Sequence, residues 1–252
     1  MKHPVVIIGM GELGGEFACG FLRGGYPVVP VLRGMAMAEV AVPEPVLVLI
    51  AVAENDLQRV LEQLPMAWRD HIVLVQNELT PRDWQCHGLK NVTVAVVWFE
   101  KKPGKPLTDI LFTPVFGPKA DLVIETLNRI GVTTRLLVSG EELIFELARK
   151  SLYILTLNIA ALKMPVSAGE IWRHHNELAC QVAGEVLQVL ELRFGRPLPR
   201  QLMIEAMAAG IEDYPNRPAR GRRAVERLER VLADARDADL VLPVLEGIGA
   251  DI

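Results

Sequence analysis

The sequence contains little cysteine and no long hydrophobic run. Its three cysteines, Cys19, Cys86 and Cys180, have the spacing of neither a metal site nor a redox pair. We therefore expect reduced, mostly buried thiols in a cytoplasmic protein that holds no metal. The longest apolar stretch, residues 46–53, is too short to span a bilayer. The apolar run at the N-terminus is too short for a signal peptide, so the sequence predicts a protein that is neither secreted nor membrane-spanning.

A strong excess of one charge is also missing. The chain has 252 residues and a formal net charge of −4, which argues against broad, non-specific nucleic-acid binding. Half of the residues are hydrophobic and 23% are charged, as in ordinary globular proteins. The length allows one large domain or two modest ones, and the sequence shows no internal repeat and no low-complexity tract.

The most informative segment lies near the N-terminus. An apolar run at residues 5–8 ends in a G-x-G-x-x-G pattern formed by Gly9, Gly11 and Gly14. Helical spacing of apolar residues follows at residues 15–23, and an extended run restarts at residues 26–32. This order of strand, glycine turn, helix and strand is the context that a dinucleotide-binding fingerprint requires.

Each glycine of this loop has a physical role in binding a dinucleotide. Gly9 would make the tight turn, Gly11 would let the backbone approach a pyrophosphate, and Gly14 would let the helix pack closely on the sheet. Backbone N–H groups at the start of the helix would then hold the phosphates. A strand, turn and helix that bind no ligand are the alternative. The residues expected to bind the cofactor here are Gly9, Met10, Gly11, Glu12, Leu13 and Gly14.

A carboxylate is missing where NAD-binding chains usually carry one. Such chains place Asp or Glu about 20 residues after the glycines, where it binds the ribose 2′-hydroxyl. Here Arg33 occupies that point, and no carboxylate follows until Glu39. A guanidinium group can bind a 2′-phosphate through two charge-assisted hydrogen bonds, so the sequence favours NADP over NAD. A solvated arginine at the end of a strand is the alternative.

The first half of the chain continues in an α/β pattern. Residues 34–45 leave little room for a helix and a strand, so we expect a sheet trimmed at that edge. Apolar runs at residues 46–52 and 71–75 predict buried parallel strands, whose tips should lie beside the glycine loop. Asn77 follows the second of these strands. It could bind a nicotinamide ribose or a substrate, or it could simply form a turn.

The pattern changes after Ser139. Before it we expect a strand at residues 92–97, a hairpin loop, a strand at 110–116, a helix at 120–130 and a strand at 133–138. Ser139 and Glu142 form the pattern of a capping box, and a long apolar helix should run to about Lys163. Only helices are predicted beyond it, at residues 170–193, 202–211 and 222–236. We therefore expect a Rossmann-type α/β domain at residues 1–138 and an all-helical domain at residues 139–252.

Two polar residues stand out in the long apolar helix. Lys150 and Asn158 are separated by eight positions and share one broad face of the helix. Because burying them without partners is costly, they must either reach solvent or line a cleft. A lysine in a cleft could protonate a carbonyl oxygen as hydride reaches the carbon, and Asn158 could orient that carbonyl. The alternative is a lysine that reaches solvent at a domain boundary and an asparagine bonded to nearby backbone.

Two further polar clusters have weaker functional interpretations. Adjacent His174 and His175 lack other ligands at metal-binding spacing, which favours a surface pair. The arginines of residues 217–230 could clamp an anionic substrate or a cofactor phosphate. A solvated helix face, balanced by acidic residues of the same segment, is the favoured interpretation.

With these residues identified, the chain resembles the ketopantoate reductase (2-dehydropantoate 2-reductase) family over most of its length. The resemblance rests on the glycine loop, on Arg33, on the V-Q-N that ends at Asn77, on an F-G-P, and above all on the helix K-S-L-Y-I-L-T-L-N that begins at Lys150. It implies an N-terminal dinucleotide domain, a helical second domain, NADPH as cofactor and an α-keto acid as substrate. It also implies that Lys150 is the general acid and that Asn158 contacts the substrate.

The sequence departs from this family at positions near the substrate. Ile154 stands where a second asparagine is usual, and Glu78 stands where glycine is usual. No serine occurs in residues 214–228, where the family carries a substrate-binding serine. We therefore expect an NADP-dependent reductase that acts in the cleft between its domains on a small, anionic keto acid other than ketopantoate. The apolar helices are compatible with a homodimer. A non-catalytic NADP-binding protein is the alternative.

Overall fold

The computed structural model describes residues 2–252, and the chain divides into two compact units. The first unit ends at Glu146, and the second comprises Leu147–Ile252. The division falls within a single long helix, α5 (Gly140–Lys163), so a functional domain boundary at Ser139 stays a prediction. Each unit is described below by itself.

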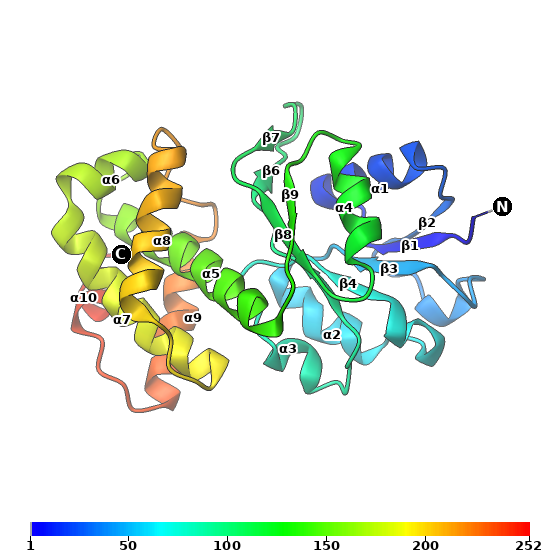
Figure 1. Ribbon diagram of the computed structural model, residues 1–252. Coiled ribbons are helices and arrows are strands. Elements are labelled where there is room, and N and C mark those ends of the chain that lie inside the picture. The colour runs from blue at the N-terminus through cyan, green and yellow to red at the C-terminus, as the bar shows by residue number, and fades with distance from the viewer. Residues whose placement is uncertain (1) are drawn as a thin grey trace. The chain divides into compact units, whose positions relative to one another are not determined.

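The first unit is built on a seven-stranded sheet (Figure 1). Its spatial order is β2-β1-β3-β4-β5-β8-β9, and all neighbouring strands are parallel except the pair β5 and β8. Its strands are β1 (Val5–Ile8), β2 (Val28–Val31), β3 (Leu47–Ile50), β4 (Ile72–Leu74), β5 (Thr93–Ala95), β8 (Thr113–Phe116) and β9 (Thr134–Leu136).

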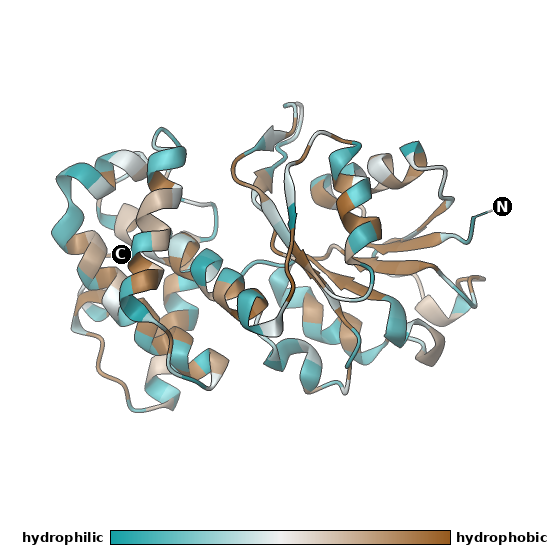
Figure 2. Cartoon of the chain, viewed as in Figure 1, coloured by the Kyte–Doolittle hydropathy of each residue, from teal (hydrophilic) through white to brown (hydrophobic). Residues whose placement is uncertain are grey.

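The central strands are apolar because helices cover both faces of the sheet. Every residue of β1, β3 and β4 is buried, and these strands are almost wholly hydrophobic in Figure 2. Val5 and Ile7 pack in one cluster with Phe17 and Phe21. Helices α1 and α4 cover one face of the sheet, and α2 and α3 cover the other (Figure 1). These helices are α1 (Glu12–Arg23), α2 (Leu57–Glu62), α3 (Arg82–Gln85) and α4 (Ala120–Asn128).

The sheet is trimmed at the β2 edge, as the short segment after Arg33 predicts. Residues 34–45 contain only a single short 3₁₀ helix, η1 (Met37–Glu39), and β2 has no outer neighbour. Pro30 sits in this edge strand, where its missing N–H breaks no ladder. Two further 3₁₀ helices, η2 (Glu54–Asp56) and η3 (Met66–His71), precede α2 and β4.

The predicted hairpin after the fifth strand is confirmed, although its strands are short. Strands β6 (Phe99–Glu100) and β7 (Thr108–Asp109) pair antiparallel as a separate ribbon. The expected strand at residues 110–116 forms only in its second half, as β8. Polar and turn-forming residues between the ribbon strands agree with this arrangement.

After α5, the second unit consists of helices joined by loops, and one isolated β-bridge pairs Ser167 with Pro218. The prediction of one helix at residues 170–193 is wrong, because His175 leaves the helical conformation with φ −132° and ψ 34°. The run of His174, His175 and Asn176 consists of weak helix formers, which explains the break. A last helix starting at Pro243 was not predicted. The helices are α6 (Ala168–His174), α7 (Asn176–Phe194), α8 (Arg200–Asp213), α9 (Ala224–Asp237) and α10 (Pro243–Ala250).

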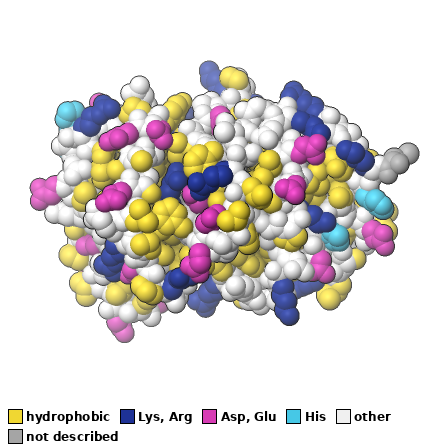
Figure 3. Space-filling view, in the orientation of Figure 1, with side chains coloured by type: hydrophobic (Ala, Val, Ile, Leu, Met, Phe, Trp, Pro, Cys, Tyr) yellow, Lys and Arg dark blue, Asp and Glu magenta, His cyan; other side chains and the backbone are white. Residues whose placement is uncertain are grey.

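The fold class expected from the sequence is therefore confirmed: a Rossmann-type α/β unit followed by helices. None of the helices formed by residues 2–252 combines the length and apolar character needed to cross a membrane. On the face shown in Figure 3, basic and acidic side chains are interspersed rather than gathered in one basic surface. The cysteines are less buried than expected, since Cys86 is exposed and the other two are half-buried.

Candidate functional site

The carboxyl ends of three parallel strands lie in register. Ile8 pairs with Ile50, and Ile50 pairs with Leu74, so β1, β3 and β4 end in one row. The glycine loop follows the first of these strands, and the loop that begins at Ala51 follows the second. Because ligands of open α/β sheets bind beyond the strand ends, this row defines the edge at which a cofactor site is expected.

Gly9 makes the tight turn that ends β1. Its φ angle is +95°, a backbone conformation that residues with a side chain rarely adopt. A Cβ atom at this position would stand 2.7 Å from the carbonyl oxygen of Ala51 and 3.1 Å from Cγ1 of Val52. Both contacts are too close, so only glycine fits. The turn is thereby held directly against the loop that follows β3.

Gly14 and Gly11 have different surroundings. A Cβ atom at Gly14 would lie 2.1 Å from the carbonyl oxygen of Gly9, so glycine is required for α1 to pack against the turn. At Gly11, apart from the residue itself and its two neighbours in the chain, no atom of residues 2–252 comes within 4 Å of the place of a Cβ atom. The protein's own packing therefore gives no reason for glycine at Gly11. Close approach of a ligand to the backbone gives one, and this is the role expected for the middle glycine.

The N-terminus of α1 offers hydrogen-bond donors to an anion. Gly11 is the N-cap residue, has extended backbone and provides no side-chain cap. The first N–H groups of a helix have no partner within the helix, and the helix dipole favours negative charge there. Gly11 and Glu12 are exposed, Leu13 is half-buried, and Met10 is 38% exposed. The loop is thus accessible and fits the pyrophosphate of a dinucleotide.

Glu12 places a carboxylate at the start of α1, where a phosphate would be repelled. Lys101, from the β6–β7 hairpin, lies 3.9 Å from a carboxylate oxygen of Glu12 and 3.6 Å from one of Glu16. Its ammonium group also donates to the carbonyl of Lys105 at 2.7 Å. The lysine therefore compensates part of the negative charge near the glycine loop.

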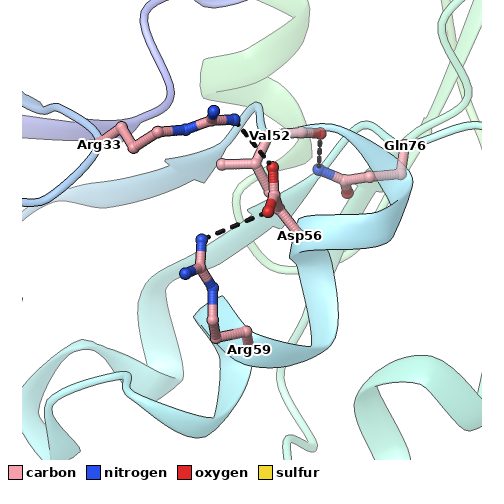
Figure 4. A network of polar contacts seen from close by, with 5 residues as sticks. All are labelled: Arg33, Val52, Asp56, Arg59 and Gln76. Atoms are coloured by element: carbon pink, nitrogen blue, oxygen red, sulfur yellow. Dashed lines mark hydrogen bonds and ion pairs between the residues drawn. The ribbon is translucent and has the colours of Figure 1, made fainter.

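Arg33 lies two residues beyond β2, and its side chain is 86% exposed. A terminal nitrogen of its guanidinium group stands 3.3 Å from Oδ2 of Asp56. The other oxygen of Asp56 is 3.3 Å from Arg59, so one carboxylate lies between two guanidinium groups (Figure 4). The missing carboxylate is thus supplied by η2, the 3₁₀ helix that follows β3, and β3 is separated from β2 by β1. The pairing of Arg33 with Asp56 could not be predicted from the sequence, because the two residues are 23 positions apart.

Asn77 lies at the same strand edge. Its amide donates to Oε1 of Glu54 at 3.1 Å, which joins the loops that follow β4 and β3. Gln76 reinforces this join by donating to the carbonyl of Ile50 at 2.7 Å. The next residue, Glu78, has φ +57°, in the left-handed region that glycine adopts most readily. The chain thus keeps a glycine-like backbone conformation at the position where the family usually has glycine.

Lys150 and Asn158 are both buried on α5, with 5% and 8% of their surfaces exposed. The helix begins as predicted, because the backbone N–H of Glu142 donates to the Ser139 hydroxyl at 3.2 Å. The carboxylate of Glu142 accepts from Val138 rather than from Ser139, so the predicted capping box is shifted by one residue. Ile154, on the turn between Lys150 and Asn158, is half-buried.

Asn158 is held by partners within the second unit. Its amide nitrogen donates to the carbonyl of Ala219 at 3.0 Å, and its amide oxygen accepts from Arg227 at 2.9 Å. Gly221 is required beside it, because a Cβ atom there would stand 2.4 Å from that oxygen. Asn158 thereby ties the segment before α9, and α9 itself, to α5. This bonding matches the interpretation of an asparagine satisfied by the protein.

The favoured interpretation of the basic segment, a solvated helix face, is wrong for two arginines. Arg227 is only 8% exposed and hydrogen-bonds Asn158. Arg217 interacts with the hydroxyl of Tyr153. Burial raises the pKa of Tyr153 above its ordinary value, and the nearby Arg217 offsets part of that rise. Arg227 precedes the buried Leu228 directly and the buried Val231 by one helical turn, so the helical period predicts its burial only weakly.

The histidine pair stays on the surface. Both His174 and His175 are exposed. Within residues 2–252, no group of three or more His, Cys, Asp or Glu side chains is arranged to hold a metal ion.

Comparisons with known proteins find the fold but no sequence relative. No family model matches the chain, and no curated protein matches it. A dimeric ketopantoate reductase from Staphylococcus aureus is 18% identical, with a TM-score of 0.67 over 98% of this chain and 96% of that one. A 2-dehydropantoate 2-reductase from Methylococcus capsulatus is 15% identical, with a TM-score of 0.68 over 98% and 94%. A D-mandelate dehydrogenase in complex with NADH is 11% identical, with a TM-score of 0.68 over 98% and 96%.

These matches cover both units of the chain and nearly the full length of the known structures. The resemblance to ketopantoate reductases is therefore confirmed at the level of the fold. At such low identity the comparison carries no assignment of individual residues, so the roles of the glycine loop, Arg33, Asn77, Lys150 and Asn158 stay predictions.

Proposed function

We propose that the chain is an NADP(H)-dependent oxidoreductase of the ketopantoate reductase type, which reduces a small α-keto acid or a related carbonyl compound. The observation that carries the proposal is the contrast within the glycine loop. Gly9 and Gly14 are required by the packing of the protein, whereas nothing in the protein requires Gly11. A glycine that the fold does not need, beside an uncapped helix N-terminus, supports a bound pyrophosphate.

The cofactor would be held by residues of the first unit. Backbone N–H groups of the loop from Gly9 to Gly14 would bind the pyrophosphate, and Arg33 would bind the 2′-phosphate of NADP. Asn77, at the carboxyl end of β4, would contact the nicotinamide ribose. The D-mandelate dehydrogenase of the same fold binds NADH, so the preference for NADP rests on Arg33 alone.

The second unit would supply the groups that act on the substrate. When bound, the reduced nicotinamide provides the hydride. Lys150 would hold a proton on Nζ and donate it to the carbonyl oxygen as negative charge develops there. Asn158 donates one amide N–H to Ala219 and accepts one hydrogen bond from Arg227. Its second amide N–H would orient the carbonyl.

The substrate would be anionic and different from ketopantoate. Two arginines next to α5, Arg217 and Arg227, give this region positive charge that suits a carboxylate. Ile154 and the absence of serine in residues 214–228 remove groups that the family uses for ketopantoate. We also propose a cytoplasmic homodimer, in line with cysteines that form no disulfide and with the dimeric ketopantoate reductase of similar fold.

A titration followed by a turnover assay tests this function. NADPH fluorescence is measured as purified protein is added, and ketopantoate and a panel of α-keto acids are then supplied while absorbance is followed. Binding together with NADPH oxidation by one panel member would establish the reductase. Protein carrying Lys150→Ala, prepared in the same way, excludes activity from a contaminating reductase. No binding of either NADPH or NADH would overturn the proposal.

A non-catalytic NADP-binding protein is the second candidate. It is favoured by Asn158, whose amide is bonded at both ends within the chain and needs no substrate. Glu78 favours it as well, since a carboxylate near the strand ends would repel an anionic substrate. Binding of NADPH without turnover across the whole panel would select this candidate over the reductase.

A further inference from the structure

One cluster of charges at the strand ends is used only in part by the function proposed above. Asp56 stands 3.3 Å from Arg33 through one carboxylate oxygen and 3.3 Å from Arg59 through the other (Figure 4). The arginine side chains are 86% and 64% exposed, whereas that of Asp56 is 31% exposed. Two accessible guanidinium groups thus converge on one shielded anionic group.

The position of this cluster relates it to the 2′ group of the adenosine ribose. That group is recognised at the end of the second strand, and Arg33 lies there. Arg59, on the first turn of α2, reaches the same carboxylate although it is 26 positions away from Arg33 in sequence. Asp56 therefore brings both a carboxylate and a second arginine to the point at which NAD and NADP differ.

We propose that Asp56 and Arg59 set the choice between NADH and NADPH, an inference that rests on the dinucleotide site proposed above. With NADH, the carboxylate of Asp56 accepts a hydrogen bond from the ribose 2′-hydroxyl. With NADPH, the 2′-phosphate takes the place of that carboxylate and bonds both Arg33 and Arg59.

The charges of the cluster predict only a moderate preference for NADPH over NADH. Two arginines with one aspartate carry a net charge of +1, which is less than a phosphate dianion requires. Asp56 must move aside when the phosphate binds, and its remaining negative charge repels the phosphate. The carboxylate therefore limits the preference for NADPH that Arg33 and Arg59 create.

Dissociation constants of NADPH and NADH, measured side by side, test the inference. Arg59→Ala should weaken NADPH binding about tenfold, as Arg33→Ala should, because a charge-assisted bond is lost. NADH binding should stay within about twofold in Arg59→Ala. Asp56→Asn should strengthen NADPH binding and weaken NADH binding, each by several-fold. The last change removes no helix cap, because Asp56 makes no capping hydrogen bond to α2.

Two comparisons separate this inference from its alternatives. Arg82→Ala removes a positive charge from an exposed residue of α3 and should leave both affinities unchanged, which controls for the overall field. If Arg59→Ala and Asp56→Asn change both affinities equally or change neither, the cluster is only a surface ion-pair network and the inference is wrong. If the parent protein binds neither dinucleotide, the proposed function fails together with it.

Discussion

At the end of β1 the backbone is exposed and has no side-chain cap, whereas on α5 the amide of Asn158 is bonded to other parts of the chain. In the described part of the chain, only Gly11 itself and its two chain neighbours come within 4 Å of the place of a Cβ atom at Gly11, and no side chain there caps α1. On α5, Asn158 donates to Ala219 and accepts from Arg227. The first region has backbone donors available to an outside partner, whereas the amide of Asn158 in the second region already has partners within the chain.

This difference determines how strongly each half of the site points to a ligand. Exposed backbone donors and a glycine without a packing role would be accounted for by a bound ligand. Buried polar groups that bond one another are explained equally well by stability, because leaving them unpaired would be costly. In the second unit the functional interpretation depends on the chemistry of Lys150, because a buried lysine carries a proton that it could transfer.

Replacing Lys150 tests whether the second unit has more than a structural role, and it should give the largest effect. Lys150→Ala should lower kcat by about 100-fold or more, the usual contribution of a general acid, and leave the dissociation constant of NADPH nearly unchanged. The control is Lys163→Ala on the last turn of the same helix, where the lysine pairs with Asp251 at 2.8 Å. That variant should keep full turnover.

The unfolding temperature must be measured for both lysine variants. Turnover of Lys150→Ala within a few-fold of the parent value would mean that the lysine is structural. No residue discussed in the second unit would then support substrate binding, whereas the glycine loop would still support cofactor binding.

Substitutions of two glycines, Gly11 and Gly15, test whether the glycine loop binds a dinucleotide. Gly11→Ala should weaken both NADPH and NADH about tenfold or more, because a methyl group would displace the pyrophosphate from a backbone donor. Gly15→Ala, four positions along and also without a neighbour within 4 Å, should leave binding unchanged. Equal affinities of the two variants would remove the reason to assign Gly11 to a ligand.

The glycine loop could be predicted because it is a local pattern. Residues 5–14 are continuous in sequence, and the roles of Gly9 and Gly14 follow from backbone geometry that any such turn must have. The trimmed edge was predictable for a similar reason, since residues 34–45 are too few for a covered strand. Short-range rules of length and periodicity decided both.

The missed features depend on contacts between residues far apart in sequence. Asp56 meets Arg33 only because β2, β1 and β3 are neighbours in the sheet. Arg227 meets Asn158 across 69 positions, and the arginine-rich segment around it resembles a solvated surface. The chemistry of each residue was visible in the sequence, but its partner was not, and the partner decides whether a charge is exposed or buried.

Asn158→Ala measures how much the hydrogen bonds of Asn158 contribute to stability. The change removes the acceptor for Arg227, a buried guanidinium group, and should lower the free energy of unfolding by about 1–3 kcal/mol. NADPH binding should not change. The control is Asn176→Ala at the exposed start of α7, which should cost less than about 1 kcal/mol. The substrate role proposed for Asn158 predicts a raised KM in addition to this loss of stability. A raised KM at the parent stability would mean that the amide serves the substrate alone and that the two regions are alike.

The smallest effect should come from an ion pair that is only structural. Glu191 accepts hydrogen bonds from Arg200 Nε at 3.2 Å and from the backbone of Leu198 at 3.1 Å, and its bond to Arg200 lowers the pKa of the carboxyl. Because the pKa is lowered on folding, the stabilisation is present above the unfolded value of about 4.3 and is lost as pH falls further.

Glu191→Gln should therefore lower stability by less than about 1 kcal/mol at pH 7, since Arg200 is half exposed and the pair is screened. The gap in unfolding temperature between variant and parent should close as the pH falls below about 4. Glu229→Gln, on the exposed side of α9, should show no gap at either pH. A Glu191→Gln gap that persists in acid would mean that packing rather than charge joins α7 to α8. Apolar packing would then contribute more to the stability of the second unit than its polar bonds do. A structural role would in that case be a weaker explanation for the buried Lys150.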